Sequence, residues 1–154
     1  MKERRAARRL AIDVLYEAEI RDRLPLEALA SRRDSGWVST GDDDELDVAV
    51  AVEPPSPEAL DYAASLIKGV QDHQADIDGL IARYADRWAI SRMPVVDRTL
   101  VRIALFELLW RADIPTPVAI NEAVELAKEL STEDSGRFIN GLLGKVVEAE
   151  EAKS

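Results

Sequence analysis

The N-terminus of the chain gathers positive charge that could bind a polyanion. Residues 1–9 contain five Lys or Arg and one acid, although the whole chain carries a net charge of −10. At ordinary salt, screening limits repulsion by the acidic remainder to about 10 Å, so a local basic segment can still capture a polyphosphate. The alternative is a solvated, frayed terminus that only aids solubility.

Helical periodicity would make this segment a surface rather than a loose tail. Apolar residues recur at intervals of three and four through residues 3–22, which predicts a helix. The four arginines of the segment are then one and four residues apart, which places on one side of that helix Arg4, Arg5, Arg8 and Arg9. Positive charge at a helix N-terminus opposes the macrodipole, and this small cost is a mild indication of function.

A second stretch with recognition chemistry is EDSGRFINGLLGKV, residues 133–146. Arg137 beside Phe138 suits a phosphate contact next to a stacked base, although an ordinary core position also explains Phe138. Asp134 and Ser135 are interpreted as the N-cap of a last helix. For Gly141 and Gly144, which disfavour a helix interior, close helix–helix contact is the favoured explanation.

The composition argues against an enzyme. There is no cysteine and a single histidine, His73, so disulfides, Cys-based zinc sites and a Ser-His-Asp triad are excluded or disfavoured. The glycines are scattered singly, so no phosphate-binding loop is present, and no carboxylate pair stands out for acid–base work. The acidic run at 42–45 is interpreted as solvated charge rather than a metal site. No apolar run suits a membrane span or a secretory signal, which predicts a cytoplasmic protein.

The elements that must position these residues are helices. Periodicity and Pro signals predict helices at 3–22, 25–33, 57–73, 75–87 and 94–113, one that starts at Thr116-Pro117, and the last helix. Residues 34–56 lack a period and are predicted to form a mobile acidic loop, in which LDVAVAV could make one strand without a partner. The predicted architecture is a single all-α domain over 1–154, a bundle of six or seven helices.

Several segments together resemble the NusB family of bacterial antitermination factors. The run VAINEAVELAK followed by DSGRFINGLL resembles the family's signature, and the Arg-rich first helix, Leu15-Tyr16 and Asp78-Gly79-Leu80 occur in the family's order. The resemblance covers about residues 3–33 and 57–147. The acidic stretch 34–56 departs from it and looks like an insertion of unassigned role.

The resemblance implies a fold of two small helical bundles and a role in RNA binding. NusB-like proteins bind the single-stranded boxA element of nascent RNA, chiefly in ribosomal RNA leaders, together with NusE, a small-subunit ribosomal protein. The complex joins elongating RNA polymerase and suppresses premature termination, without cofactor or catalysis. By this resemblance the residues expected at the RNA are Arg4, Arg5, Arg8, Arg9, Tyr16, Tyr84, Asp134, Arg137 and Phe138. Partial burial also explains Tyr16 and Tyr84, and Asp97 falls where the family meets NusE.

Two other functions remain open at this stage. The basic segment could bind an acidic protein, which would make the chain an interaction module without an RNA role. A NusB-like domain also precedes the catalytic domain of RNA cytosine methyltransferases, but no cysteine is present for their covalent step. Some NusB-like proteins are monomers and others form homodimers through the RNA-binding face, and the sequence does not decide between these states.

Overall fold

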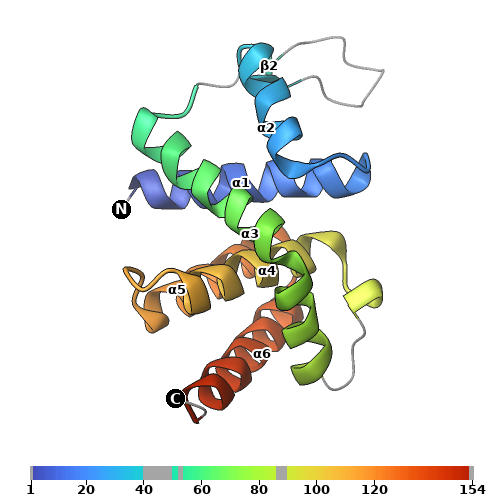
Figure 1. Cartoon of the computed structure of the whole chain (residues 1–154), viewed down its shortest axis with the longest axis vertical. Helices are drawn as coiled ribbons and strands as arrows, with labels where there is room; N and C mark the ends of the chain where they lie inside the picture. The colour runs from blue at the N-terminus through green and yellow to red at the C-terminus, as the bar shows by residue number, and fades with distance from the viewer. Residues whose placement is uncertain (1, 40–49, 52–53, 86–89, 153–154) are drawn as a thin grey trace.

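Six α-helices account for most of the described chain (Figure 1). The computed structural model describes residues 2–39, 50–51, 54–85 and 90–152. In chain order the elements are α1 (Lys2–Ile20), α2 (Pro25–Asp34), β1 (Val38–Ser39), β2 (Val50–Ala51), α3 (Pro57–Tyr84), the 3-10 helix η1 (Ile90–Arg92), α4 (Val95–Trp110), α5 (Thr116–Leu130) and α6 (Glu133–Ala152). The predicted all-α bundle is confirmed. Within the described ranges, no helix is both long and apolar enough to cross a membrane.

One local prediction fails in the segment 34–56. Val38 pairs with Ala51 and Ser39 with Val50 in a short antiparallel ladder, so the strand in LDVAVAV does have a partner. The partner is only two residues long and follows α2 almost directly, which is too short for a period to reveal it. The acidic run at 42–45 lies outside the described residues, as does most of the predicted mobile loop.

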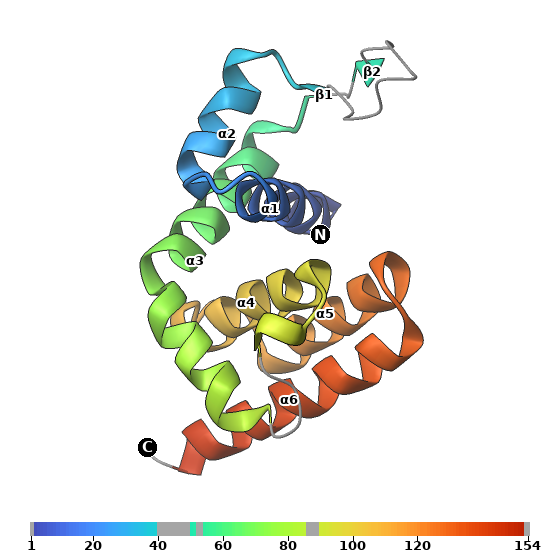
Figure 2. The same cartoon turned by 90° about the vertical axis from the view of Figure 1, so that its right-hand side faces the viewer.

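Helix α3 is the element that the two halves of the fold share. It is one continuous helix of 28 residues, so the prediction of separate helices at 57–73 and 75–87 is wrong. No Pro or Gly lies near the predicted break at residue 74 to interrupt the backbone. Its first part packs with α1 and α2, and its last part extends toward α6 (Figures 1 and 2). The mostly polar run QDHQAD between the buried residues Val70 and Ile77 is what imitated a break in the sequence.

The start of α3 follows the sequence prediction. The Ser56 hydroxyl accepts a hydrogen bond from the Ala59 amide at 3.2 Å, and Pro57 occupies the first helical turn. The cap satisfies an amide that has no partner inside the helix. The entry of the chain into α3 is therefore fixed.

A glycine sets the distance between α3 and α4. A Cβ atom built on Gly69 would lie 2.1 Å from the Phe106 ring, whose side chain is 7% exposed. The Phe106 ring stacks in turn toward His73, with ring centroids 6.0 Å apart. Only a residue without a side chain lets the aromatic ring lie on the α3 backbone here.

Replacing Gly69 by Ala is expected to destabilise the fold by about 1–3 kcal/mol, because the new methyl group overpacks the contact with Phe106. Gly79→Ala is the matched control on the same helix, since a Cβ at Gly79 meets nothing within 4 Å. That control should gain about 0.5–1 kcal/mol from the better helix former. Urea unfolding of both variants measures the difference, and equal effects at the two positions would contradict this account of the α3–α4 contact.

Candidate nucleic-acid interface

Arg8 anchors α1 to the rest of the molecule. Its side chain is 5% exposed, and its guanidinium donates to both carboxylate oxygens of Glu107 on α4, at 2.9 Å from Nε and 2.8 Å from Nη2. The Tyr62 hydroxyl on α3 donates to the same carboxylate. Burial and the neighbouring Glu107 raise the pKa of Tyr62, so the phenol stays protonated. Three helices therefore meet at one neutralised ion pair.

The prediction that Arg8 belongs to an exposed basic patch is therefore wrong. The buried face of α1 includes Ala7, Ala11 and Leu15, and helical spacing puts Arg8 beside that face. An arginine can occupy such a position only because Glu107 compensates its charge. Arg8 is a positioning residue in this fold. The more exposed arginines of the basic segment are Arg4, Arg5 and Arg9, and these three are called the arm below.

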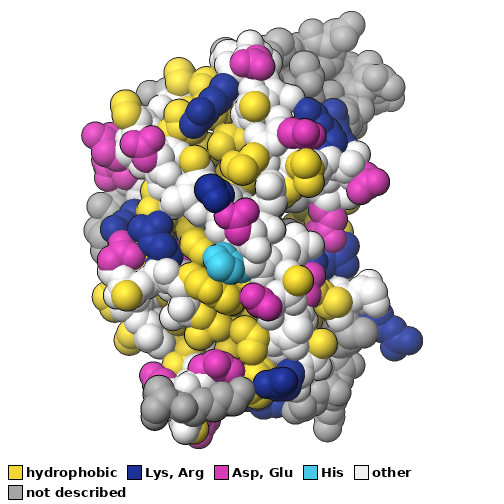
Figure 3. Space-filling model, in the orientation of Figure 1, with side chains coloured by type: hydrophobic (Ala, Val, Ile, Leu, Met, Phe, Trp, Pro, Cys, Tyr) yellow, Lys and Arg dark blue, Asp and Glu magenta, His cyan; other side chains and the backbone are white. Residues whose placement is uncertain are grey.

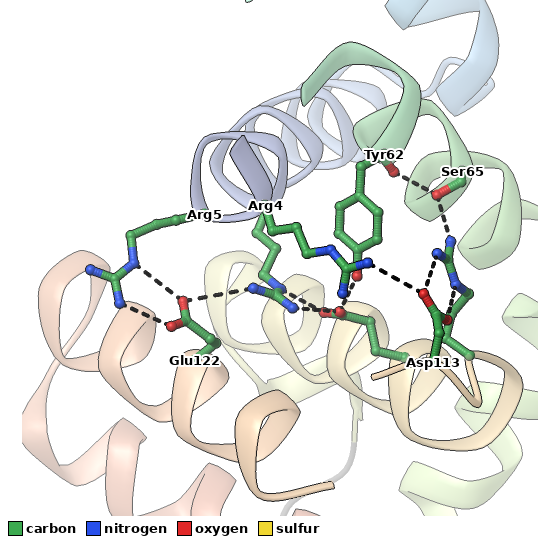
Figure 4. Close-up of polar contacts among 9 residues, drawn as sticks. Arg4, Arg5, Tyr62, Ser65, Asp113 and Glu122 are labelled. Carbon is green, nitrogen blue, oxygen red and sulfur yellow. Dashed lines mark hydrogen bonds and ion pairs between the residues drawn. The ribbon is translucent and has the colours of Figure 1, made fainter. Parts of the chain in front are cut away.

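The three exposed arginines reach toward acids that follow α4 or lie on α5. Arg4 Nη2 lies 3.4 Å from Asp113, Arg5 pairs with Glu122 at 2.9 Å, and Arg9 pairs with Glu129. Figure 4 shows Arg4 and Arg5 extending from α1 toward Asp113 and Glu122. A hydrogen bond from Arg5 lowers the pKa of Glu122, and one from Arg9 lowers the pKa of Glu129. The basic segment is thus ordered by ion pairs rather than frayed.

Asp113, the partner of Arg4, also forms an ion pair with Arg111. Arg111 binds it with Nε at 3.0 Å and Nη2 at 3.1 Å, and also donates to the Ser65 hydroxyl at 2.9 Å (Figure 4). The hydrogen bond from Arg111 is the main cause that lowers the pKa of Asp113 to about 2. The guanidinium groups of Arg4 and Arg111 each lie 5.0 Å from the centre of the Tyr62 ring. Tyr62 therefore joins the buried pair to the exposed one.

A groove runs beside the arm between α1 and α5. Its volume is about 310 Å³, and its lining residues are Arg5, Glu122, Glu125, Leu126, Lys128 and Glu129. Figure 3 shows basic and acidic side chains next to one another on the face it draws, not a continuous basic surface. The α1–α5 groove is accordingly a site of mixed charge.

The start of α6 is hydrogen-bonded to Asp97, a residue of α4. Thr132, not Asp134 or Ser135, caps the helix, since its hydroxyl accepts from the Ser135 amide at 3.0 Å. Ser135 is buried, and its hydroxyl donates to Asp97 at 2.7 Å. The predicted Asp134-Ser135 cap is therefore wrong, because the helix begins at Glu133 and Ser135 faces inward.

Asp97 is not a surface residue. Its side chain is completely buried in the first turn of α4, and Oδ1 has no hydrogen-bond partner among the described residues. The expectation that Asp97 itself contacts a protein partner is therefore wrong. That expectation came from the resemblance to the family, which gives a position along the chain but not the burial of its side chain. Asp97 instead fixes the segment that carries Asp134, Arg137 and Phe138.

The other predicted RNA residues are placed unequally. The side chains of Arg137 and Asp134 are 75% and 88% exposed. They form an ion pair with 3.2 Å between Arg137 Nη1 and Asp134 Oδ1. Phe138 is half-buried against the core, and Tyr16 is exposed on α1, two turns beyond Arg9. Arg9 binds Glu129 in the last turn of α5, and Glu129 is only four residues before the start of α6 at Glu133.

Tyr84 does not join this group. It is half-buried against the core at the C-terminal end of α3, the end that points away from α1 in Figures 1 and 2. The explanation for Gly141 and Gly144 fails as well, because a Cβ at either position meets nothing within 4 Å. The close approach in this region is at Gly136, where a Cβ would lie 3.1 Å from the Lys128 side chain.

Several residues of the site were not singled out from the sequence, among them Glu107, Tyr62, Glu122 and Glu129. Glu107 left one signal, since it is the only charged residue in the run IALFELLW. A lone acid in an otherwise apolar helix requires a buried cation. Tyr62 and Glu122 have ordinary helical spacing and gave no comparable indication. Among the described residues, no cluster of three or more His, Asp or Glu side chains could hold a metal ion.

Comparisons with known proteins agree with this architecture. The sequence profile of the NusB family matches residues 5–148. The transcription antitermination protein NusB of Salinispora arenicola is 48% identical over 148 residues, 96% of this chain and 97% of its own length. A chain in the crystal structure of "a plectonemic RNA supercoil" is 25% identical over the whole of both chains, with a TM-score of 0.80. A chain of the antitermination factors NusB and NusE in complex with double-stranded RNA shares the fold, with 24% identity, a TM-score of 0.76 and coverage of 97% and 98%.

The fold and these relatives define the class as a transcription antitermination factor, not an enzyme. The chain belongs to the NusB family.

Removing the partner of Arg8 should cost far more stability than removing the partner of Arg4. Glu107→Gln leaves a buried guanidinium uncompensated, at an expected cost of about 3–5 kcal/mol. Asp113→Asn is the matched control at an exposed site, where about 0–1 kcal/mol is expected. Denaturant unfolding compares the two, and a Glu107→Gln variant as stable as the control would show that the buried pair does not anchor α1.

The hydroxyl of Ser135 should also be needed for stability. Ser135→Ala removes the one hydrogen bond found for the buried Asp97 carboxylate, so a loss of about 1–3 kcal/mol is expected. Ser131→Ala, which removes a neighbouring hydroxyl 3.1 Å from that of Ser135, should cost less. Thermal unfolding of the two variants is the measurement, and the reverse ranking would refute a pinning role for Asp97.

Proposed function

We propose that the protein binds single-stranded boxA RNA in nascent ribosomal RNA together with NusE. In the elongating RNA polymerase complex, this binding suppresses premature termination. Membership of the NusB family and the RNA named with two related structures support the proposal. The observation that carries it is the placement of three exposed arginines on α1, whose last member, Arg9, lies at the end of α5 that leads to Arg137 and Phe138.

The chemistry of the site suits single-stranded RNA. Arginine forks bind phosphate oxygens, and a flat side chain next to them can stack on a base. Arg4, Arg5 and Arg9 supply the charge, and Tyr16 on α1 and Phe138 on α6 are the rings proposed to stack on bases. In this proposal Arg8 and Asp97 act indirectly, because they hold α1 and α6 in place. Tyr84 has the weakest place in the RNA site, since it lies at the far end of α3.

NusE is expected to supply part of the affinity. The chain carries a net charge of −10, and the exposed arginines are few. The protein alone should therefore bind RNA weakly, with a salt dependence set by a small number of phosphates. If NusE docks near the start of α4, it would contact partly exposed residues such as Val95 and Val96, which precede the buried Asp97.

The test is fluorescence anisotropy with a short boxA RNA and a scrambled RNA, with and without NusE, at two salt concentrations. Selective binding that strengthens with NusE is expected. The double variant Arg5→Gln/Arg9→Gln should weaken that binding about thirtyfold or more, since each of the two lost phosphate contacts to a charged donor is worth about 1–3 kcal/mol. Arg33→Gln, at an exposed position on α2, is the control with the same type of charge change and should bind like the wild type.

Two results would count against the proposal. If boxA RNA and scrambled RNA bind equally with and without NusE, the sequence-selective role is wrong. If the double variant loses NusE binding but keeps RNA binding, the arm serves a protein partner instead. Light scattering of the same samples gives the oligomeric state, which reveals any homodimer that covers the groove.

A further inference from the structure

The arginines proposed to bind RNA already hold carboxylates. Arg5 donates to both oxygens of Glu122, at 3.3 Å from Nε and 2.9 Å from Nη2, and Arg9 pairs with Glu129. Both acids line the α1–α5 groove. The guanidinium donors of Arg5 that a phosphate would use are thus already bound by Glu122, on the α5 side of the same groove.

Carboxylate and phosphate oxygens compete for the same guanidinium donors. An arginine fork matches either group, so a phosphate that binds through the same donors has to displace the carboxylate. Exposed ion pairs are weak, and the Arg9 and Glu129 side chains are 41% and 54% exposed. The Arg9 pair is therefore one that a phosphate can displace.

The two acids are not equally mobile. The Glu122 side chain is 15% exposed and also lies 3.8 Å from the buried Arg8 guanidinium, which holds it in place. Glu129 lies in the last turn of α5, and the ion pair found for it among the described residues is that with Arg9. Glu129 is the acid whose removal should change RNA binding with the least effect on the fold.

We infer that Glu122 and Glu129 lower the RNA affinity of the arm by occupying Arg5 and Arg9 until a phosphate displaces them. This inference rests on the proposed RNA-binding function and assigns two specificity-determining residues to it. Opening an Arg–Glu ion pair costs free energy, and a loosely bound phosphate does not offset that cost. Tight binding therefore requires an RNA that fits the site well, and a partner. They reduce the binding of arbitrary RNA by the isolated protein.

The salt dependence distinguishes competition from a change in general charge. When a phosphate displaces Glu129, the freed carboxylate takes up a cation and offsets one of those that the RNA releases. With Gln at this position that uptake is absent, so the plot of log affinity against log salt should become steeper, by at most about 0.7, the value for one phosphate of a single strand. A purely structural role of Glu129 would not change this slope.

The experiment measures boxA RNA binding in the presence of NusE for the wild type, Glu129→Gln and Glu148→Gln over a series of salt concentrations. Glu148 is exposed near the end of α6 and provides the same charge change away from the groove. Glu129→Gln is expected to bind about twofold to fivefold more tightly at low salt, the equivalent of one exposed ion pair, and with the steeper slope. Glu122→Gln is the second variant and should act in the same direction if its unfolding midpoint is retained.

The outcomes separate this inference from the function on which it rests. If the wild type binds boxA RNA selectively but Glu129→Gln matches Glu148→Gln in affinity and slope, the competition is refuted and the function stands. If the wild type shows no selective binding under any condition, the proposed function fails and the inference with it. Tighter binding with an unchanged slope would also overturn it, because the gain would then come from general charge.

Discussion

The buried pair between Arg8 and Glu107 is the interaction on which the rest of the interface depends. It is formed between α1 and α4, and the Tyr62 hydroxyl adds α3 to it. Burying two charges is costly, and only the bidentate geometry with a further donor offsets the loss of water. Once this pair is made, the direction of α1 is fixed, and with it the positions of the arginines on either side of Arg8.

This anchor produces a division of roles among four arginines that look alike in the sequence. Arg8 faces inward and holds the helix. Arg4, Arg5 and Arg9 have more exposed side chains and pair with Asp113, Glu122 and Glu129, and the pairs of Arg4 and Arg9, exposed on both sides, are the weakest. A second anchor, the hydrogen bond from Ser135 to Asp97, holds the start of α6 in a similar way. Both surfaces proposed to meet RNA thus rest on a buried carboxylate from α4.

The sequence predicts the architecture well because helical periodicity, Pro positions and the Ser56 cap are local signals. It predicts burial of single charged residues poorly, since that depends on a partner far along the chain. Arg8 and Glu107 are 99 positions apart, and Asp97 and Ser135 are 38 apart. The continuous α3 was missed because a polar run at residues 71–76 imitates a helix break, and the β1–β2 pair because two-residue strands have no period. The acids opposite the arm could not be foreseen, since no local pattern marks them as partners of α1.

The most direct test of this account is NMR observation of the arginine side-chain Nε–Hε signals while boxA RNA is added in the presence of NusE. The account predicts that the signals of Arg5 and Arg9 shift strongly as carboxylate partners are replaced by phosphate. The signal of Arg8 should stay in place, since its bond to Glu107 persists. A shift of Arg8 as large as that of Arg9, or no shift of any arginine in α1 when RNA binds, would contradict the account.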